Sequence, residues 1–303
     1  MAHRFTQVLI TMSALAIGCT AIWAQQGGRG GVPAAVPNAQ ALAPVDLTGY
    51  WVSVITEDWR FRMVTPPKGD FTSVPLNAAG INATNQWDPA KDTSSGEQCR
   101  AFGAGGIMRM PVRLHITWQD NATLKIEVDN GNQVRFLHLD SAARAPEKAD
   151  WQGFSLASWE LFAPGQGIVA VPVAAGGGRG GAAGGAAGGV VNPGRGGGRG
   201  RGAGPAAPQL SGSLKAVTTK MRPGYVRRNG VPYSANATLT EYFDRIEESN
   251  RDSWLVETAS LDDPQYYQVP FLVTNHYKRE PDGSKFNPRP CEVTMPVDGV
   301  HGQ

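Results

Sequence analysis

The sequence lacks most features that mark a membrane-spanning, metal-binding or nucleotide-binding protein. Beyond residue 24, no apolar run approaches the ~20 residues that a membrane-spanning helix needs. His-x-His, His-Glu-x-x-His and Cys-x-x-Cys are absent, so the sequence predicts neither a metal site nor a cofactor. Gly-x-Ser-x-Gly is absent too, and the Gly-x-Gly runs do not join a strand to a helix. These absences argue against a serine hydrolase and against a phosphate-binding loop.

One apolar run is present at the N-terminus, and it is typical of an export signal. His3 and Arg4 precede it, and the run Val8–Trp23 is shorter than a membrane span. Ala24 is small and suits cleavage, so we expect removal of residues 1–24 and a periplasmic or secreted mature protein. Lipid anchoring through Cys19 is the alternative, because Ala-Ile-Gly-Cys resembles a lipoprotein processing site.

Cysteine is scarce, with three residues in the whole chain, and signal cleavage removes Cys19. Cys99 and Cys291 then form an even pair in an oxidising compartment, which predicts one disulfide between an early loop and the C-terminal segment. Neither has another Cys or a His close in sequence, which argues against a zinc site. Two unpaired thiols are the remaining alternative.

Glycine is abundant, with 38 residues, but it is concentrated in two tracts that contain no acidic residue. Residues 25–44 predict a flexible tether, and residues 171–208 predict a disordered insertion, because neither composition can bury a core. Six of the 28 bases lie before residue 45 or in this insertion, so the remaining 22 are outnumbered by the 26 acids. An acidic exported domain argues against nucleic acid as a partner, although the Arg-Gly repeats resemble RNA-binding segments.

The rest of residues 45–303 predicts a single domain dominated by alternation of apolar and polar residues. Residues 112–139 predict a three-stranded antiparallel meander whose second hairpin turns at Asn130-Gly131, with positive φ at both positions. Further strands are expected at Leu47–Ile55, Gly153–Leu161, Ser213–Met221, Thr238–Ile246, Ser253–Leu261 and Phe271–Arg279. So many short strands favour an all-β protein, an antiparallel lipocalin-like barrel of about 8–10 strands, because closure removes exposed edges.

Little helix is expected. Leu76–Trp87 predicts one short helix, and Pro264–Tyr267 predicts a turn. Trp59–Met63 predicts an additional strand. The Gly-rich insertion separates two strands that would otherwise be hairpin neighbours, and loop-closure entropy rises only slowly with length. We therefore expect the insertion to be an enlarged loop within one domain.

The first strand resembles the start of lipocalins, which are ligand-binding barrels. Gly49-Tyr50-Trp51 is similar to their Gly-x-Trp motif, in which the tryptophan closes one end of the barrel. Thr240-Glu241-Tyr242 is similar to a second lipocalin motif with Glu in place of Asp, and Arg279 to the basic residue of a third. This resemblance implies an eight-stranded barrel with an interior ligand.

A second resemblance covers most of residues 45–292 and is to a group of secreted bacterial proteins of unknown function. It is carried by WDPAKD (87–92), EQCR (97–100), IMRMP (107–111), RLHITW (113–118), W-x-G-x-S (151–155), DDPQYY (262–267) and PCE (290–292). It implies one exported domain and a cysteine pair, and it brings no known catalytic residue.

Alternating aromatic and cationic residues at 58–63 are the clearest ligand-binding pattern. Such a strand can line a pocket that binds a carboxylate through Arg60 or Arg62, and an edge strand with outward charges is the alternative. The candidate ligand-binding residues are Trp51, Trp59, Arg60, Arg62, Arg113, Arg135 and Tyr242.

Acid–base candidates are fewer. His115 alternates with apolar residues, so it points either into a cavity or to solvent. Asp263 is a candidate acid or base, and capping of the turn before Pro264 is its alternative role. Three histidines lie on separate predicted strands, so a metal site formed by their convergence in the folded protein stays an alternative. The candidate catalytic residues are His115, Glu241, Asp263 and His276.

Together these patterns predict an exported, monomeric β-barrel that binds a small apolar or aromatic ligand, neutral or anionic, in its interior. One alternative is a cofactor-independent acid–base enzyme of the isomerase, lyase or hydrolase type on the same barrel. A second is a structural or interaction protein with a filled core. An open apolar cavity would exclude the filled core, and a His and a carboxylate in contact inside it would favour the enzyme.

Overall fold

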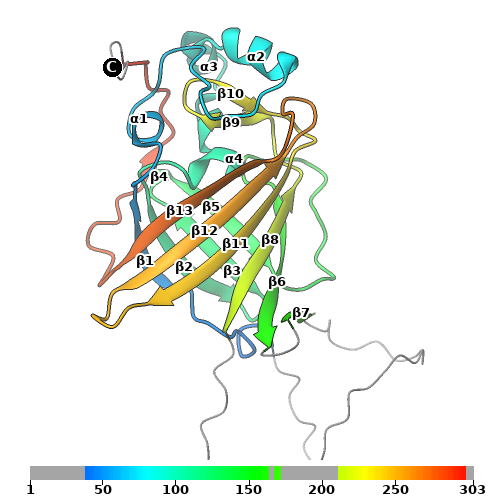
Figure 1. Cartoon of the computed structure of the whole chain (residues 1–303), viewed down its shortest axis with the longest axis vertical. Coiled ribbons are helices and arrows are strands. Elements are labelled where there is room, and N and C mark those ends of the chain that lie inside the picture. The colour runs from blue at the N-terminus through cyan, green and yellow to red at the C-terminus, as the bar shows by residue number, and fades with distance from the viewer. Residues whose placement is uncertain (1–37, 164–166, 172–210, 298–303) are drawn as a thin grey trace, which may run out of the picture. The chain divides into compact units, whose positions relative to one another are not determined.

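The structure, a computed structural model, describes residues 38–163, 167–171 and 211–297. Nine of its strands close into a barrel in the order β5-β3-β2-β1-β13-β12-β11-β8-β6, because β6 also pairs with β5 (Figure 1). These strands are β1 (Gly49–Val54), β2 (Arg113–Asp120), β3 (Thr123–Val128), β5 (Gln133–His138), β6 (Phe154–Ala163), β8 (Ser211–Thr219), β11 (Thr238–Glu247), β12 (Ser253–Asp262) and β13 (Phe271–Glu280).

The barrel is mixed rather than wholly antiparallel. Eight neighbouring pairs are antiparallel, but β5 and β6 are parallel, with Leu137 opposite Ser155. Residues 139–153 make the crossover that this pairing needs, since parallel neighbours require a connection of roughly a dozen residues or more. The predicted β-barrel with little helix is confirmed, and the prediction of purely antiparallel pairing was wrong.

The predicted meander is confirmed in β2, β3 and β5, but its second turn differs. Gly131 and Asn132 have positive φ angles of 88° and 48°, whereas Asn130 does not. Asn130–Gly131 forms the short strand β4 and pairs in parallel with β14 (Arg289–Pro290). Because Asn130 and Gly131 pair with the C-terminal segment, the two residues with positive φ are Gly131 and Asn132 rather than the predicted Asn130 and Gly131.

The expected pairing around the Gly-rich insertion is present, since β6 and β8 are antiparallel neighbours. An additional strand, β7 (Gly167–Val171), continues along the other edge of β6. The predicted insertion, apart from its first residue, and the predicted signal, residues 1–24, lie outside the described residues. The folded part begins before residue 45: Ala39 is 1% exposed in the core, and the Gln40 N–H donates to the Asn121 carbonyl (3.0 Å).

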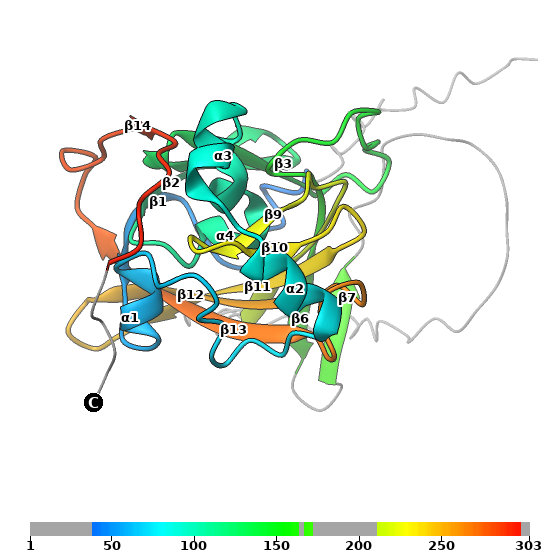
Figure 2. The ribbon, with the colours of Figure 1, turned by 90° about the horizontal axis from the view of Figure 1, so that it is seen from above.

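Short helices and one hairpin gather at one end of the barrel and are called here the cap (Figures 1 and 2). The predicted helix at 76–87 is confirmed as α2, and no helix among the described residues is long and apolar enough to cross a membrane. The cap consists of α1 (Trp59–Arg62), α2 (Ala78–Asn85), α3 (Pro89–Ser94), the 3₁₀ helix η1 (Gln98–Phe102), α4 (Ala104–Ile107), β9 (Gly224–Arg227) and β10 (Val231–Tyr233).

The prediction of a strand at Trp59–Met63 was wrong, because this segment forms α1. Both edges of β1 are already paired with β2 and β13, so the segment has no barrel edge beside that strand. Asp58 instead turns the chain with a φ of 51°, and its carbonyl accepts the N–H groups of Phe61 (2.8 Å) and Arg62 (3.1 Å).

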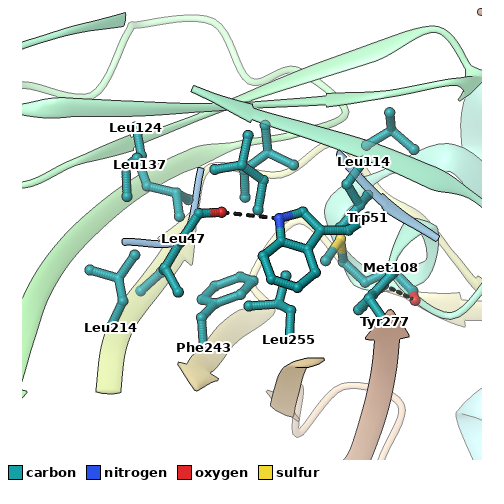
Figure 3. Close-up of a cluster of buried hydrophobic side chains, with 14 of the residues drawn as sticks. Leu47, Trp51, Met108, Leu114, Leu124, Leu137, Leu214, Phe243, Leu255 and Tyr277 are labelled. Carbon is teal, nitrogen blue, oxygen red and sulfur yellow. Dashed lines mark hydrogen bonds between the residues drawn. The ribbon is translucent and has the colours of Figure 1, made fainter. Parts of the chain in front are cut away.

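Two hydrophobic clusters form the core. The larger lies between the barrel strands and surrounds Trp51, which is fully buried and donates its indole N–H to the Leu47 carbonyl (3.0 Å; Figure 3). The smaller joins the barrel mouth to the cap and includes Tyr233, Leu239 and Phe271. The cap is therefore part of the same folded body as the barrel.

The predicted Cys99–Cys291 disulfide is present, with Cα atoms 5.1 Å apart and a sequence separation of 192. Cys99 lies in η1, and Cys291 directly follows β14. The bond therefore ties the cap to the C-terminal segment.

Replacing both residues, in Cys99→Ser/Cys291→Ser, should lower the free energy of unfolding by roughly 2–5 kcal/mol, because the unfolded chain regains a long loop. Urea denaturation with and without reductant measures this loss. Cys19→Ser, made in the chain that keeps residues 1–24, serves as the control and should leave the midpoint unchanged. Equal midpoints for the wild type and the double variant would contradict the prediction.

Candidate functional site

Four buried polar side chains from four strands form a layer across the barrel interior. They are Arg135 (β5), Glu241 (β11), Glu257 (β12) and Asn275 (β13), and each is at most 1% exposed. The Arg135 Nη1 and Nη2 groups donate to the two Glu241 carboxylate oxygens at 2.8 and 2.5 Å, and Asn275 Nδ2 donates to Glu257 Oε2 at 2.5 Å. This layer contains the only ion pair between wholly buried side chains found among the described residues.

Protonation keeps this layer close to neutral. Burial raises the pKa of Glu257 to about 8, and the nearby Glu241 carboxylate adds to the shift. Burial would lower the pKa of Arg135, but the negative charge of Glu241 outweighs it and raises that pKa. At neutral pH, Glu257 is therefore mostly protonated, and Arg135 keeps its charge.

The barrel interior has little free space beside this layer. A cavity lined by Glu257 and Asn275, together with Met108 and Phe271, has a volume of about 10 Å³, which is close to that of one water molecule. Trp51, Phe243 and Tyr277 fill the part of the barrel that lies farther from the cap (Figure 3). The described side chains therefore occupy the interior, where we expected a ligand.

The four candidate catalytic residues lie apart. His115 is on the outer face of the barrel, where its ring stacks on Tyr50 (4.1 Å between centroids) and its Nδ1 lies 3.0 Å from Glu127 Oε2. His276 Nδ1 is 3.9 Å from Glu57 Oε1. No group of three or more His, Cys, Asp or Glu in the described ranges is placed to hold a metal ion.

The other two candidates, Glu241 and Asp263, are buried and fully engaged. Glu241 pairs with Arg135, as described above. Asp263 is 0% exposed, and its carboxylate accepts the Ser234 N–H (2.7 Å), the Ser234 hydroxyl (2.8 Å) and the Gln265 N–H (3.2 Å). These contacts link the end of β10 to the turn after β12, which agrees with the capping role considered for Asp263.

The candidate ligand-binding residues are also dispersed. Trp51 belongs to the core, and Trp59 is 61% exposed on α1. Arg113 pairs with Glu280 (3.0 Å), and Tyr242 lies on the outer face, 5.4 Å from the Lys215 ammonium. Arg60 stacks over the Phe61 ring, whereas Arg62 and Arg135 are buried, the latter bound to Glu241.

A ligand-sized cleft lies in the cap rather than in the barrel. It has a volume of about 220 Å³ and is bordered by the end of α2, by α3 and by the β9–β10 hairpin. This aromatic cleft is lined by Ala83, Gln86, Trp87, Asp88, Lys91, Asp92, Arg100, Pro223, Gly224, Tyr225, Gly230, Pro232, Tyr233 and Tyr266.

Hydrogen bonds fix the polar wall of the aromatic cleft. Asp92 is 4% exposed and accepts from the Trp87 indole (3.2 Å), from Arg100 Nη1 (3.0 Å) and from the Tyr225 hydroxyl (3.0 Å to Oδ2). Arg100 Nη1 also donates to the Tyr225 oxygen (3.0 Å). Burial raises the pKa of Tyr225 to about 12, so this phenol stays protonated and remains a donor.

Two of the sequence segments that carried the resemblance to secreted proteins line this cleft, although their residue types did not indicate a binding site. Trp87, Asp88, Lys91 and Asp92 belong to the WDPAKD segment, and Arg100 to EQCR, both of which carried the resemblance to secreted proteins. Glu257 was missed although it occupies an inward position of β12, between Leu255 and Ala259. A polar residue in the inward phase of a strand is a detectable sign of a buried polar layer.

Comparison of the chain with protein-family models, with curated proteins and with solved structures gave no match. The resemblances to lipocalins and to a secreted bacterial family therefore stay predictions from the sequence.

The protonation of Glu257 predicts a pH dependence of stability. Its pKa is higher in the folded protein than in the unfolded chain, so its contribution is complete below about pH 4.5 and is lost as the pH rises toward 8. Glu257→Gln imitates the protonated side chain and should remove this dependence. Relative to that variant, the wild type should lose up to a few kcal/mol of unfolding free energy between pH 5 and 8. Urea denaturation across this range measures the difference, and parallel curves for the two proteins would refute it.

Proposed function

We propose that this chain is a binding protein for a small neutral aromatic molecule, which occupies the aromatic cleft in the cap. The observation that carries the proposal is the aromatic wall of this cleft, in which Tyr225 and Tyr266 are partly exposed and the buried Trp87 and Tyr233 lie behind them. Clefts that hold drug-sized ligands are roughly 300–1,000 Å³, so one of about 220 Å³ suits a molecule with one or two rings.

The charges around the cleft support a neutral ligand. Asp88 and Asp92 are balanced by Lys91 and Arg100, all four of which line it. A charged ligand would therefore meet no excess of opposite charge. Gln86 adds a polar group that can orient a hydroxyl or an N–H, whereas the Tyr225 O–H is already donated to Asp92.

Backbone geometry holds part of the aromatic wall in place before any ligand arrives. Gly230 has a φ of 84°, and a Cβ there would collide with the Trp87 ring. A Cβ at Gly224 would likewise meet the Tyr233 side chain. Both glycines allow the rings to rest directly on the β9–β10 backbone, and such preorganisation lowers the entropic cost of binding.

The same geometry favours binding over acid–base catalysis. Neither His115 nor His276 lines the cleft, and both oxygens of Asp92 already accept hydrogen bonds. The raised pKa of Tyr225 opposes its use as a base. Export to the periplasm or the medium, which residues 1–24 predict, and a monomeric state are part of the proposal.

Filling the cleft should abolish binding without disturbing the polar wall. Ala83 lines the cleft on α2, so Ala83→Trp should place an indole in the space that the ligand needs. We expect indole or 4-methylphenol to bind the wild type, and Ala83→Trp to weaken that binding at least ~10-fold, as measured by isothermal titration calorimetry.

Ala79→Trp is the matched control, because Ala79 is exposed on the same helix and does not line the cleft. It should bind both probes as the wild type does. The proposal fails if neither probe binds the wild type, or if Ala83→Trp binds them with unchanged affinity while remaining folded.

A further inference from the structure

Three buried arginines lie together at a second cavity in the cap, called here the arginine cavity. Arg62 ends α1, Arg109 follows α4, and Arg227 ends β9; they are 3%, 6% and 4% exposed. All three line this cavity, together with Phe61, Ala101, Gly106, Met110, Val226 and Arg228. Three segments far apart in sequence thus bring guanidinium groups to one place.

Several donors of these arginines have no acceptor. Arg62 Nη1 and Nη2, Arg109 Nε, and Arg227 Nε and Nη1 are buried and make no hydrogen bond with any residue that the structure describes. Buried donors without acceptors are rare in folded proteins, and charged ones are the most costly. An acceptor with negative charge is therefore the group that this cavity lacks.

Carboxylates of the chain satisfy the arginines in part. Asp58 accepts from Arg109 Nη2 at 3.0 Å but is 4.0 Å from Arg227 Nη2. Glu57 Oε1 is 4.0 Å from Arg62 Nη1. Separations of 4.0 Å are too long for a hydrogen bond, and Glu57 and Asp58 are partly exposed.

The charge around the cavity remains positive. With Arg228, four arginines line it, and the carboxylates that act on them are Glu57, Asp58 and Asp70. Burial, and then repulsion by Arg109, lowers the pKa of Arg227 to about 10 and also lowers that of Arg62. Both arginines remain protonated at neutral pH.

Aromatic rings and a backbone contact hold these groups in position. The Arg227 guanidinium lies 4.1 Å from the Phe61 ring centroid, and that of Arg109 lies 5.3 Å from Phe271. Arg62 Nε donates to the Arg109 carbonyl at 2.7 Å, which directs its two terminal nitrogens away from that bond. The free donors are thus preorganised.

We propose that the arginine cavity binds a small oxyanion, either a carboxylate or a phosphate group, free or at the end of a larger molecule. Guanidinium groups bind both through paired N–H···O contacts. The cavity volume of about 10 Å³ has room for about one oxygen atom, so the anion would place one oxygen among the arginines while the rest of it stays at the mouth of the cavity. The site does not depend on the aromatic cleft, because Tyr225 of β9 lines that cleft, whereas Val226 and Arg227 line this cavity.

Thermal unfolding of the full chain in sodium phosphate, sodium formate and sodium chloride, at equal ionic strength and pH 7, tests the proposal. Phosphate or formate should raise the Tm of the wild type by at least ~3 °C more than chloride does. This gain should disappear in Arg62→Met and Arg227→Met. A gain with phosphate alone identifies a phosphate site, and a gain with formate identifies a carboxylate site.

Arg60→Met is the control, since it removes the same charge from the same helix at a residue that does not line the cavity. Arg60→Met should show the same gain in Tm in phosphate or formate as the wild type. A loss of that gain in Arg62→Met and Arg227→Met would then not come from a general effect of salt or of removing one positive charge. In chloride, Arg227→Met should be at least as stable as the wild type, because an unsatisfied buried charge is removed. If Arg227 only stabilised the fold, Arg227→Met would instead have a lower Tm than the wild type in chloride.

Direct titration of the wild type by calorimetry covers the case in which the Arg62 or Arg227 variant does not fold. The expected result is saturable binding of phosphate or formate by the wild type and by Arg60→Met. The proposal is overturned if neither anion binds the wild type, or if the anion-dependent gain in Tm is the same in Arg62→Met, Arg227→Met and the wild type.

Discussion

The bidentate ion pair between Arg135 and Glu241 is the constraint around which the barrel is organised. It joins β5 to β11, which are not neighbours in the barrel order, so it spans the interior. A buried charge is costly unless it is paired. A slip of one residue in either strand would turn one partner outward and leave the other unpaired in the core. The pair therefore favours one inward face for β5 and one for β11.

The polar layer also divides the core in two. Along β11, Glu241 separates Leu239 of the cap cluster from Phe243 of the barrel cluster, and along β12 Glu257 separates Ala259 from Leu255 in the same way. The barrel below the layer is filled with large side chains and resembles a closed core more than a ligand cavity. The cleft of about 220 Å³ and the three buried arginines lie in the cap instead.

Within the cap, β9 separates two chemically different sites. Tyr225 faces the aromatic cleft, whose charges balance, whereas Arg227 faces the arginine cavity, whose charge is positive. The disulfide at Cys99 lies in η1, next to Arg100 and Ala101, which line the cleft and the cavity respectively. The disulfide therefore ties the helix that lines both the cleft and the cavity to the C-terminal segment.

The sequence by itself determined the barrel strands and helix α2, but not the other elements of the cap. Alternation of apolar and polar residues placed the barrel strands to within a few residues, and the two cysteines that follow the expected signal indicated their own pairing. These properties depend on neighbouring residues or on a simple count. The turn at residues 129–132 and helix α1 departed from expectation, because pairing with β14 and the occupied edges of β1 outweighed local preference.

Only the tertiary structure decided which polar residues meet. Arg135 and Glu241 are 106 positions apart, and Arg62, Arg109 and Arg227 come from three separate segments. Sequence patterns identified Arg62 as a candidate anion ligand but placed it on a strand, and they assigned Glu241 to catalysis rather than to an ion pair. The physical reason is that alternation reports whether a side chain faces inward, whereas the closure of the barrel and the packing of the cap determine which other inward side chains it contacts.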